Sequence, residues 1–193
     1  PGAGADDPEA AVRDLLTGAG ALYGWATADL AAGPTGDVLR AYASPLEEWV
    51  GAEVESSEVD IDTLETEVSD RDGGGRRVVI TALEGTITWT DADGDEDNAA
   101  VEWDGTCLLT GDPDDLEAMP DEERVEAADL CLTGGWERLG VEELAVVAVE
   151  EGGTWRIDPL ATIGDYVTTI VPQLTRAHVL RALEVPEACA GRK

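Results

Sequence analysis

Histidine and lysine, which many enzymes use for acid–base and covalent chemistry, are almost absent from this sequence. The 193 residues include one histidine, His178, and one lysine, Lys193, which is the last residue. Metal sites with several histidines and histidine-paired acid–base networks therefore cannot be built, and neither a Schiff-base lysine nor a P-loop is available. No GxGxxG follows a predicted strand, and no GxSxG motif occurs. The remaining candidate for proton transfer is a carboxylate beside a tyrosine. Asp165 and Tyr166, which are adjacent in the sequence, are the nearest such pair.

These candidates also have ordinary structural interpretations. An Asp and a Tyr at a helix start commonly serve as a cap and a packing contact. His178 lies between Ala177 and Val179 of a predicted helix, where a structural or surface histidine is expected. The sequence therefore predicts no catalytic residue and no cofactor, although it does not decide whether the protein is an enzyme.

An acidic segment at residues 91–97, DADGDED, has carboxylates at the spacing of a calcium-binding loop, with Glu102 at the twelfth position. The sixth position is Glu96, where that motif requires glycine, and the flanking residues are predicted strands instead of helices. We expect a solvated acidic hairpin turn and assign no metal site, while calcium binding stays an open alternative.

Tryptophan is the main aromatic residue, with six copies in a chain that has no phenylalanine. Such side chains could line an apolar pocket or an interface, but they must also fill the core. The predicted ligand-binding set is Trp25, Trp89, Trp103, Trp155 and Ile157.

Three cysteines are present: Cys107, Cys131 and Cys189. Cys107 lies at the end of a predicted strand and Cys131 at the end of a predicted helix, and we predict a disulfide between them. Its loop closure would contribute about 3 to 4 kcal/mol. The alternative is three reduced thiols in a cytoplasmic protein, and the pairing of Cys189 stays open.

The charge balance restricts the partners. Asp and Glu number 43 against 12 Lys and Arg, which gives a formal net charge of -31. Such a surface repels phosphate backbones and anionic lipids, so we expect no nucleic-acid binding and no direct membrane binding by this domain. Residues 1–6 are typical of a linker or a truncation point, and an export signal or membrane anchor could precede them.

The first half of the chain changes from helical to strand periodicity. Apolar residues at helical spacing predict a helix from Asp7 to about residue 30, followed by shorter helices near 36–42 and 46–50. From residue 53 the pattern alternates, and a phase shift between Ile61 and Leu64 predicts a β-bulge. Residues 76–90, with a bend at Gly85, and residues 99–109 are predicted to be long antiparallel strands at the centre of a sheet.

The second half is predicted to close the fold. Residues 111–120 are a polar connection, and residues 121–132 a helix. Residues 141–158 form a hairpin that turns at 151–153, and its first strand, apolar on both faces, should lie inside the sheet. A helix from about residue 162 to 185 is interrupted at Pro172. The fold class is therefore α+β, with N-terminal helices on a curved antiparallel sheet and an additional C-terminal helix. One domain spans 7–187, followed by a tail at 188–193.

In this order of elements the chain resembles the nuclear-transport-factor-2-like superfamily, also called cystatin-like or SnoaL-like. The residues that carry the resemblance are the N-terminal helix with Leu15, Leu16, Leu22, Tyr23 and Trp25, the strands of Trp89 and Trp103, and the closing segment GGTWRIDPLATIGDY. It is most similar to the extracytoplasmic domains that actinobacteria attach to lipoproteins and membrane-anchored proteins. Members of this superfamily include isomerases, cyclases and dehydratases as well as non-catalytic binding and assembly modules.

We therefore expect a secreted or membrane-tethered domain that binds a protein partner or a small apolar ligand without catalysis. One alternative is a SnoaL-like pocket enzyme that transfers protons with Asp or Tyr. The other is an assembly module in which the exposed sheet face pairs with a second copy, so a homodimer is possible. A buried Asp beside a polar partner would favour the enzyme, and an open apolar groove the binding role.

Overall fold

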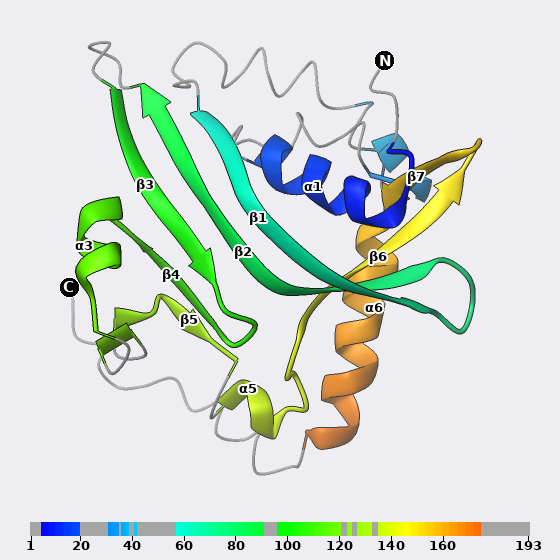
Figure 1. Ribbon diagram of the computed structural model, residues 1–193. Coiled ribbons are helices and arrows are strands. Elements are labelled where there is room, and N and C mark those ends of the chain that lie inside the picture. The colour runs from blue at the N-terminus through cyan, green and yellow to red at the C-terminus, as the bar shows by residue number, and fades with distance from the viewer. Residues whose placement is uncertain are drawn as a thin grey trace, which may run out of the picture.

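A curved sheet of seven antiparallel strands forms the body of the described structure (Figure 1). The computed structural model describes residues 5–19, 31–34, 36–38, 41, 57–90, 96–120, 123–124, 127–132 and 135–174. The strands are β1 (Ser57–Asp70), β2 (Arg76–Thr90), β3 (Glu96–Trp103), β4 (Cys107–Gly111), β5 (Leu130–Cys131), β6 (Leu144–Glu151) and β7 (Thr154–Ile157). The helices are α1 (Pro8–Ala19), α3 (Pro113–Ala118), α5 (Gly135–Arg138), α6 (Pro159–Ile170) and a 3-10 turn, η1 (Val171–Gln173). The predicted α+β class with a curved antiparallel sheet is confirmed.

Strand β2 organises the sheet, because it pairs along its whole length with β1 and in two parts with other strands. Its second part, from Leu83 to Thr90, pairs with β3, and its first part, from Arg76 to Ile80, pairs with β6. The order across the sheet is β5-β4-β3-β2-β6-β7. As Figure 1 shows, β1 and β2 bend together between the β3 part and the β6 part of the sheet.

Helix α1 lies across the strands and packs on β1, β6 and β7 (Figure 1). Asp7 caps its N-terminus by accepting a hydrogen bond from the amide of Ala10 at 2.8 Å, and Pro8 occupies the first turn. Ala11 and Val12 are fully buried against the sheet. The buried core cluster consists of Ala5, Ala11, Val12, Ile61, Leu64, Val78, Ile80, Trp103, Leu132, Val141, Ala148 and Ile157.

The predicted strand at 76–90 and the predicted β-bulge are confirmed. The register between β1 and β2 shifts between Ile61 and Thr63 and again between Glu65 and Thr66. Gly85 lies opposite Ile61, at the first shift. A Cβ atom at Gly85 would lie 2.4 Å from the Asp60 carbonyl oxygen and 3.3 Å from the Ile61 Cα. The bend therefore depends on a residue without a side chain.

Replacing Gly85 with alanine should lower the free energy of unfolding by about 1 to 3 kcal/mol, because backbone atoms of β1 would have to move away. Urea unfolding measures the change. Gly164→Ala in α6 is the matched control: its Cβ would meet nothing within 4 Å, and helix propensity alone should stabilise it by about 0.5 to 1 kcal/mol. Equal effects of the two variants would contradict the close approach of β1 and β2.

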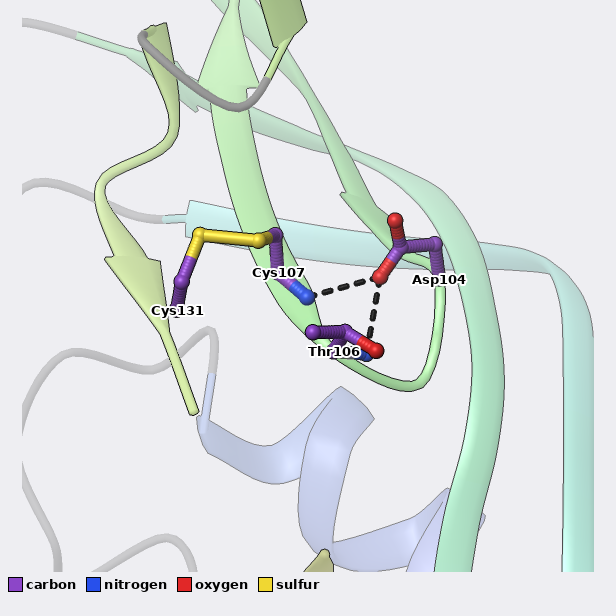
Figure 2. The surroundings of a disulfide bond; sticks show 4 residues. All are labelled: Asp104, Thr106, Cys107 and Cys131. Carbon is purple, nitrogen blue, oxygen red and sulfur yellow. Dashed lines mark hydrogen bonds between the residues drawn. A yellow bond between two sulfur atoms is a disulfide. The ribbon is translucent and has the colours of Figure 1, made fainter. Parts of the chain in front are cut away.

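The single strand predicted at 99–109 is wrong. The chain turns at Asp104–Thr106 and separates β3 from β4. The Asp104 carboxylate accepts hydrogen bonds from the amides of Thr106 and Cys107, both at 2.7 Å, and Gly105 adopts a φ of 89° (Figure 2). This side-chain turn competes successfully with continued strand pairing because Gly105 adopts the left-handed conformation without steric cost.

The helix predicted at 121–132 is wrong at its C-terminal end, although residues 123–124 and 127 are helical. Leu130 and Cys131 form strand β5, opposite Leu108 and Cys107 of β4. The polar connection predicted at 111–120 also differs, because it contains helix α3. Asp112 caps α3 by accepting from the amide of Asp114, and Pro113 begins the helix.

The C-terminal hairpin matches the prediction closely, with β6, a turn at Gly152 and Gly153, and β7. Strand β6 lies between β2 and β7 in the sheet order. Helix α6 begins at Pro159, earlier than predicted, because Asp158 caps it through the amide of Ala161 at 2.9 Å. Pro172 lies in η1, where the regular helix ends.

Two backbone bridges join N-terminal residues to β7. Ala5 pairs with Trp155, and Ala31 pairs with Ile157. Ala5 belongs to the segment 1–6 that was expected to be a linker, yet it is buried. The parts of the predicted helices at 20–30, 46–50 and 175–185, the acidic turn at 91–95, and residues Trp25, His178 and Cys189 lie outside the described residues.

Candidate functional site

An apolar pocket of about 200 Å³ lies between α1 and the β1–β2–β3 part of the sheet. Its lining residues are Leu16 of α1, Val59 and Ile61 of β1, Leu83, Gly85 and Ile87 of β2, and Val101 of β3. Strand register brings them together, since Val59 faces Ile87 across the β1–β2 pair and Gly85 faces both Ile61 and Val101. Directly paired residues share one face of a sheet, so these side chains form one continuous apolar surface under α1.

The pocket can hold an apolar group but offers no reactive one. None of its seven lining residues has a side chain that ionises or hydrogen-bonds. Six of them are half-buried and only Ile61 is buried, so the pocket opens toward the surface. Dry apolar cavities of about 150 Å³ accept ligands the size of benzene. The geometry therefore suits a small hydrocarbon-like molecule or the apolar end of a larger one.

Four residues of the predicted ligand-binding set are described, and none is among the residues that line this pocket. Trp103 is 3% exposed in the core, where its Nε1 donates to the Ile80 carbonyl oxygen at 2.8 Å. Ile157 is buried and Trp155 is half-buried, and both pack with the core from β7. Trp89 is half-buried near the end of β2, two residues beyond Ile87 on the same face.

Sequence reasoning missed the aliphatic residues that line the pocket. A signal was present in the alternation of Val59 and Ile61 and of Leu83, Gly85 and Ile87. The bend at Gly85 was predicted, but the space beside it was not. An alternating apolar strand fits a filled core as well as a pocket.

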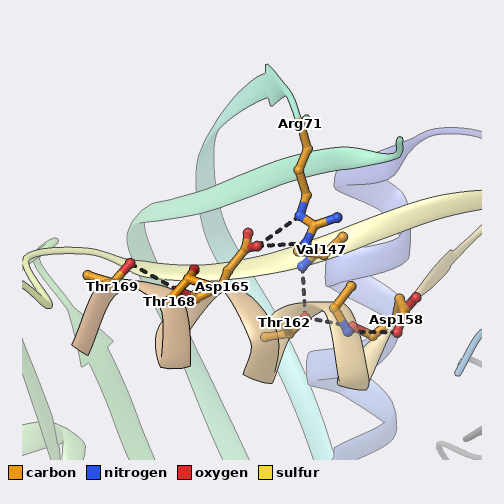
Figure 3. Close-up of polar contacts among 8 residues, drawn as sticks. Arg71, Val147, Asp158, Thr162, Asp165, Thr168 and Thr169 are labelled. Carbon is orange, nitrogen blue, oxygen red and sulfur yellow. Dashed lines mark hydrogen bonds and ion pairs between the residues drawn. The ribbon is translucent and has the colours of Figure 1, made fainter. Parts of the chain in front are cut away.

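The pair Asp165 and Tyr166 on α6 is engaged in structural contacts. Asp165 Oδ1 accepts from Arg71 Nε at 2.9 Å and from Arg71 Nη2 at 2.8 Å (Figure 3). The hydrogen bond to Asp165 raises the pKa of the Arg71 guanidinium above its ordinary value; burial acts to lower it, and the charges of Asp165 and Asp158 raise it further. Arg71 therefore stays charged and ties the β1–β2 turn to α6.

Side chains of α6 cover the part of β6 that, among the described strands, has no neighbour on that side. The hydroxyl of Tyr166 accepts from the amide of Ala145 at 2.8 Å, and it lies 3.1 Å from the Ala145 carbonyl oxygen, to which it can donate. One turn earlier, Thr162 Oγ1 accepts from the amide of Val147 at 2.9 Å and donates to the Asp158 carbonyl oxygen (Figure 3). Thr162 and Tyr166 are four residues apart and lie on the same face of α6. Their hydroxyls therefore bond to the amides of Val147 and Ala145, which both point outward from the edge of β6.

Replacing Tyr166 with phenylalanine should lower the free energy of unfolding by about 1 to 2 kcal/mol, because the amide of Ala145 loses its partner. Chemical denaturation measures the loss. Thr168→Ala on the same helix is the control: its exposed hydroxyl bonds only to the Asp165 carbonyl oxygen, and the change should stay within about 0.5 kcal/mol. A neutral Tyr166→Phe would mean that its hydroxyl does not support the strand edge.

A second, polar pocket of about 300 Å³ lies between β6 and α6. Its charged residues include Arg77, which pairs with Glu143 at 2.7 Å, and Asp165, which pairs with Arg71. Its tyrosine is Tyr166, already bonded to β6. Because these groups have partners within the protein, they are poorly suited to proton transfer; the other carboxylate that lines this pocket, Glu142, is exposed.

The described part of the chain shows no buried polar or charged residue and no group of three or more His, Cys, Asp or Glu side chains arranged to hold a metal ion. None of its helices is long and apolar enough to cross a membrane.

The predicted disulfide is present, with Cys107 and Cys131 facing each other across β4 and β5 (Figure 2).

No protein-family model matches the chain, no curated protein matches it, and no solved structure matches its fold. The resemblance to the nuclear-transport-factor-2-like superfamily therefore rests on the residues of the chain itself.

Proposed function

We propose that this protein is a non-catalytic extracytoplasmic domain of the nuclear-transport-factor-2-like type that binds a small apolar ligand in the pocket beneath α1. The observation that carries the proposal is the lining, which is entirely aliphatic apart from Gly85. Apolar surface in an open pocket gains free energy when a ligand removes it from water. In the proposed arrangement the N-terminal helices cover this face of the sheet and the C-terminal helix lies against β6.

The compartment is proposed from the disulfide and the charge. A disulfide between β4 and β5 favours an oxidising environment outside the cytoplasm. A net charge of -31 keeps the domain soluble and away from anionic surfaces.

The two alternatives receive less support from the described residues. A pocket enzyme would need an Asp or Tyr available for proton transfer in its cavity. The apolar pocket has neither, and in the polar pocket Asp165 pairs with Arg71 and Tyr166 bonds to β6. Assembly through the edge of the sheet, as distinct from its exposed face, would use the outer edge of β1, which pairs only with β2 among the described strands. That strand exposes six acidic side chains, Glu58, Asp60, Asp62, Glu65, Glu67 and Asp70, and contains two register shifts. Both features oppose edge-to-edge pairing between copies.

Binding of the neutral fluorescent probe N-phenyl-1-naphthylamine tests the proposal. The probe should become fluorescent with the full chain, and Ile87→Glu should weaken its binding by about tenfold or more, because the ligand would then have to desolvate a carboxylate. Val68→Glu is the control, since Val68 is an exposed apolar residue of β1 outside the pocket. Equal affinity of the two variants, both folded by circular dichroism, would refute binding in this pocket.

A further inference from the structure

Helix α6 and the following turn η1 expose a row of aliphatic side chains. The row, called here the α6 stripe, consists of Leu160, Ile163, Val167, Val171 and Leu174, which are 57%, 58%, 49%, 56% and 42% exposed. Their spacing of three or four residues places them on one side of the helix. The opposite side carries Thr162 and Tyr166, which bond to β6. The helix is therefore apolar on the side that faces away from its own sheet.

Gly164 lies within this stripe, four residues after Leu160 and three before Val167. A glycine inside a helix costs about 0.5 to 1 kcal/mol relative to alanine. A Cβ atom at Gly164 would meet nothing within 4 Å, and its φ is not positive. Neither packing nor backbone conformation within the described structure requires this glycine. A bare backbone between large aliphatic side chains does provide a recess for a side chain of another helix.

The charge around the stripe distinguishes between possible occupants. Asp165 is the only charged residue of α6, and Arg71 pairs with it. The stripe is thus uncharged, whereas the chain as a whole carries -31. A second copy would bring an equal negative charge and would therefore be repelled. The negative charge of the protein, which repels a second copy, attracts a positively charged partner.

We propose that the α6 stripe is the docking surface for an amphipathic helix of a partner protein, aliphatic on one side and flanked by Arg and Lys. From Leu160 to Leu174 the stripe is about 21 Å long, which matches a partner helix of about four turns. Helices recognised in this way present anchors at three- and four-residue spacing, and the recess at Gly164 receives one of them. The surface is separate from the apolar pocket, whose residues come from α1, β1, β2 and β3.

Calorimetric titration of the full chain with two synthetic helical peptides tests the proposal. Both peptides carry the same Leu and Ile face over four turns, one with Arg and Lys on its flanks and the other with Glu. The basic peptide should bind and the acidic one should not, and affinity should fall as salt is added. Val167→Asp, Ile163→Asp and Gly164→Leu should each weaken the binding of the basic peptide by about tenfold or more.

Val68→Asp is the matched control, because it adds the same negative charge at an exposed apolar position of β1. Simple attraction between a basic peptide and an acidic protein would make both Asp substitutions neutral or favourable, so equal binding by Val167→Asp and Val68→Asp overturns the proposal. It is also overturned if sedimentation shows a dimer that Val167→Asp dissociates, since the occupant is then a second copy. Binding that begins only after residues 175–193 are removed overturns it too. Binding of the fluorescent probe in the apolar pocket should be unchanged by Val167→Asp. Failure of the docking proposal can therefore be distinguished from failure of the proposed ligand-binding function.

Discussion

Replacing Trp103 with alanine should lower the free energy of unfolding by about 3 to 5 kcal/mol. The indole fills the place where the pairing of β2 changes from β3 to β6, and it is 3% exposed. Its Nε1 donates to the Ile80 carbonyl oxygen at 2.8 Å. Alanine would leave a cavity in the core and a buried carbonyl group without its donor. Urea unfolding followed by circular dichroism measures the loss.

Trp136→Ala is the matched control, because Trp136 is 43% exposed on α5. It removes the same side chain, and its cost should be well below that of Trp103→Ala, since little packing is lost. A loss below about 1 kcal/mol for Trp103→Ala would contradict a core role and would return Trp103 to the candidate ligand-binding residues.

Removing the disulfide by the double substitution Cys107→Ala and Cys131→Ala should cost about 3 to 4 kcal/mol, since the bond closes a loop with a sequence separation of 24. Alanine is chosen because Cys107 is 4% exposed, where the hydroxyl of serine would be desolvated. Strand β5 has only two residues, so it depends on this bond more than longer strands would. Urea midpoints with and without reductant provide the measurement.

The single variant Cys189→Ala provides the control for loss of a thiol and should leave the midpoint unchanged. Reductant should lower the midpoint of the wild-type protein and have no effect on the double variant. If the wild-type midpoint were insensitive to reductant, the disulfide would not be a source of stability in solution.

The parts of the fold predicted correctly are those that nearby residues determine. Strand β2 matches the predicted range, and the bulge follows from the phase shift between Ile61 and Leu64. The break after Trp103 was missed because the apolar alternation continues through Gly105 to Cys107. Nothing in that alternation shows that the carboxylate of Asp104 captures two amides. The strand at Leu130 and Cys131 was missed because β4, distant in sequence, provides its pairing and its disulfide.

The candidate site was predicted less well, because a pocket is a product of packing. Tryptophans were selected for their size, but Trp103 fills the core and the pocket is lined by smaller side chains. The role of Thr162 and Tyr166 depends on which amides of β6 remain unpaired, which only the assembled sheet determines. The disulfide was predicted correctly, although Cys131 was expected to end a helix and lies in a strand.

The backbone bridge between Ala5 and Trp155 affects the order in which the protein folds. Ala5 donates to the Trp155 carbonyl oxygen at 3.1 Å, and Trp155 donates back at 2.8 Å, across 150 positions of sequence (155 minus 5). Strands β1 and β2 are separated by only five residues, from Arg71 to Gly75. Loop closure across the longer span costs about 3 kcal/mol more before any contact forms. The β1–β2 hairpin should therefore form early and the Ala5 bridge late, and pulse-labelled hydrogen exchange should protect the amide of Val79, which faces β1 opposite Glu67, before that of Ala5.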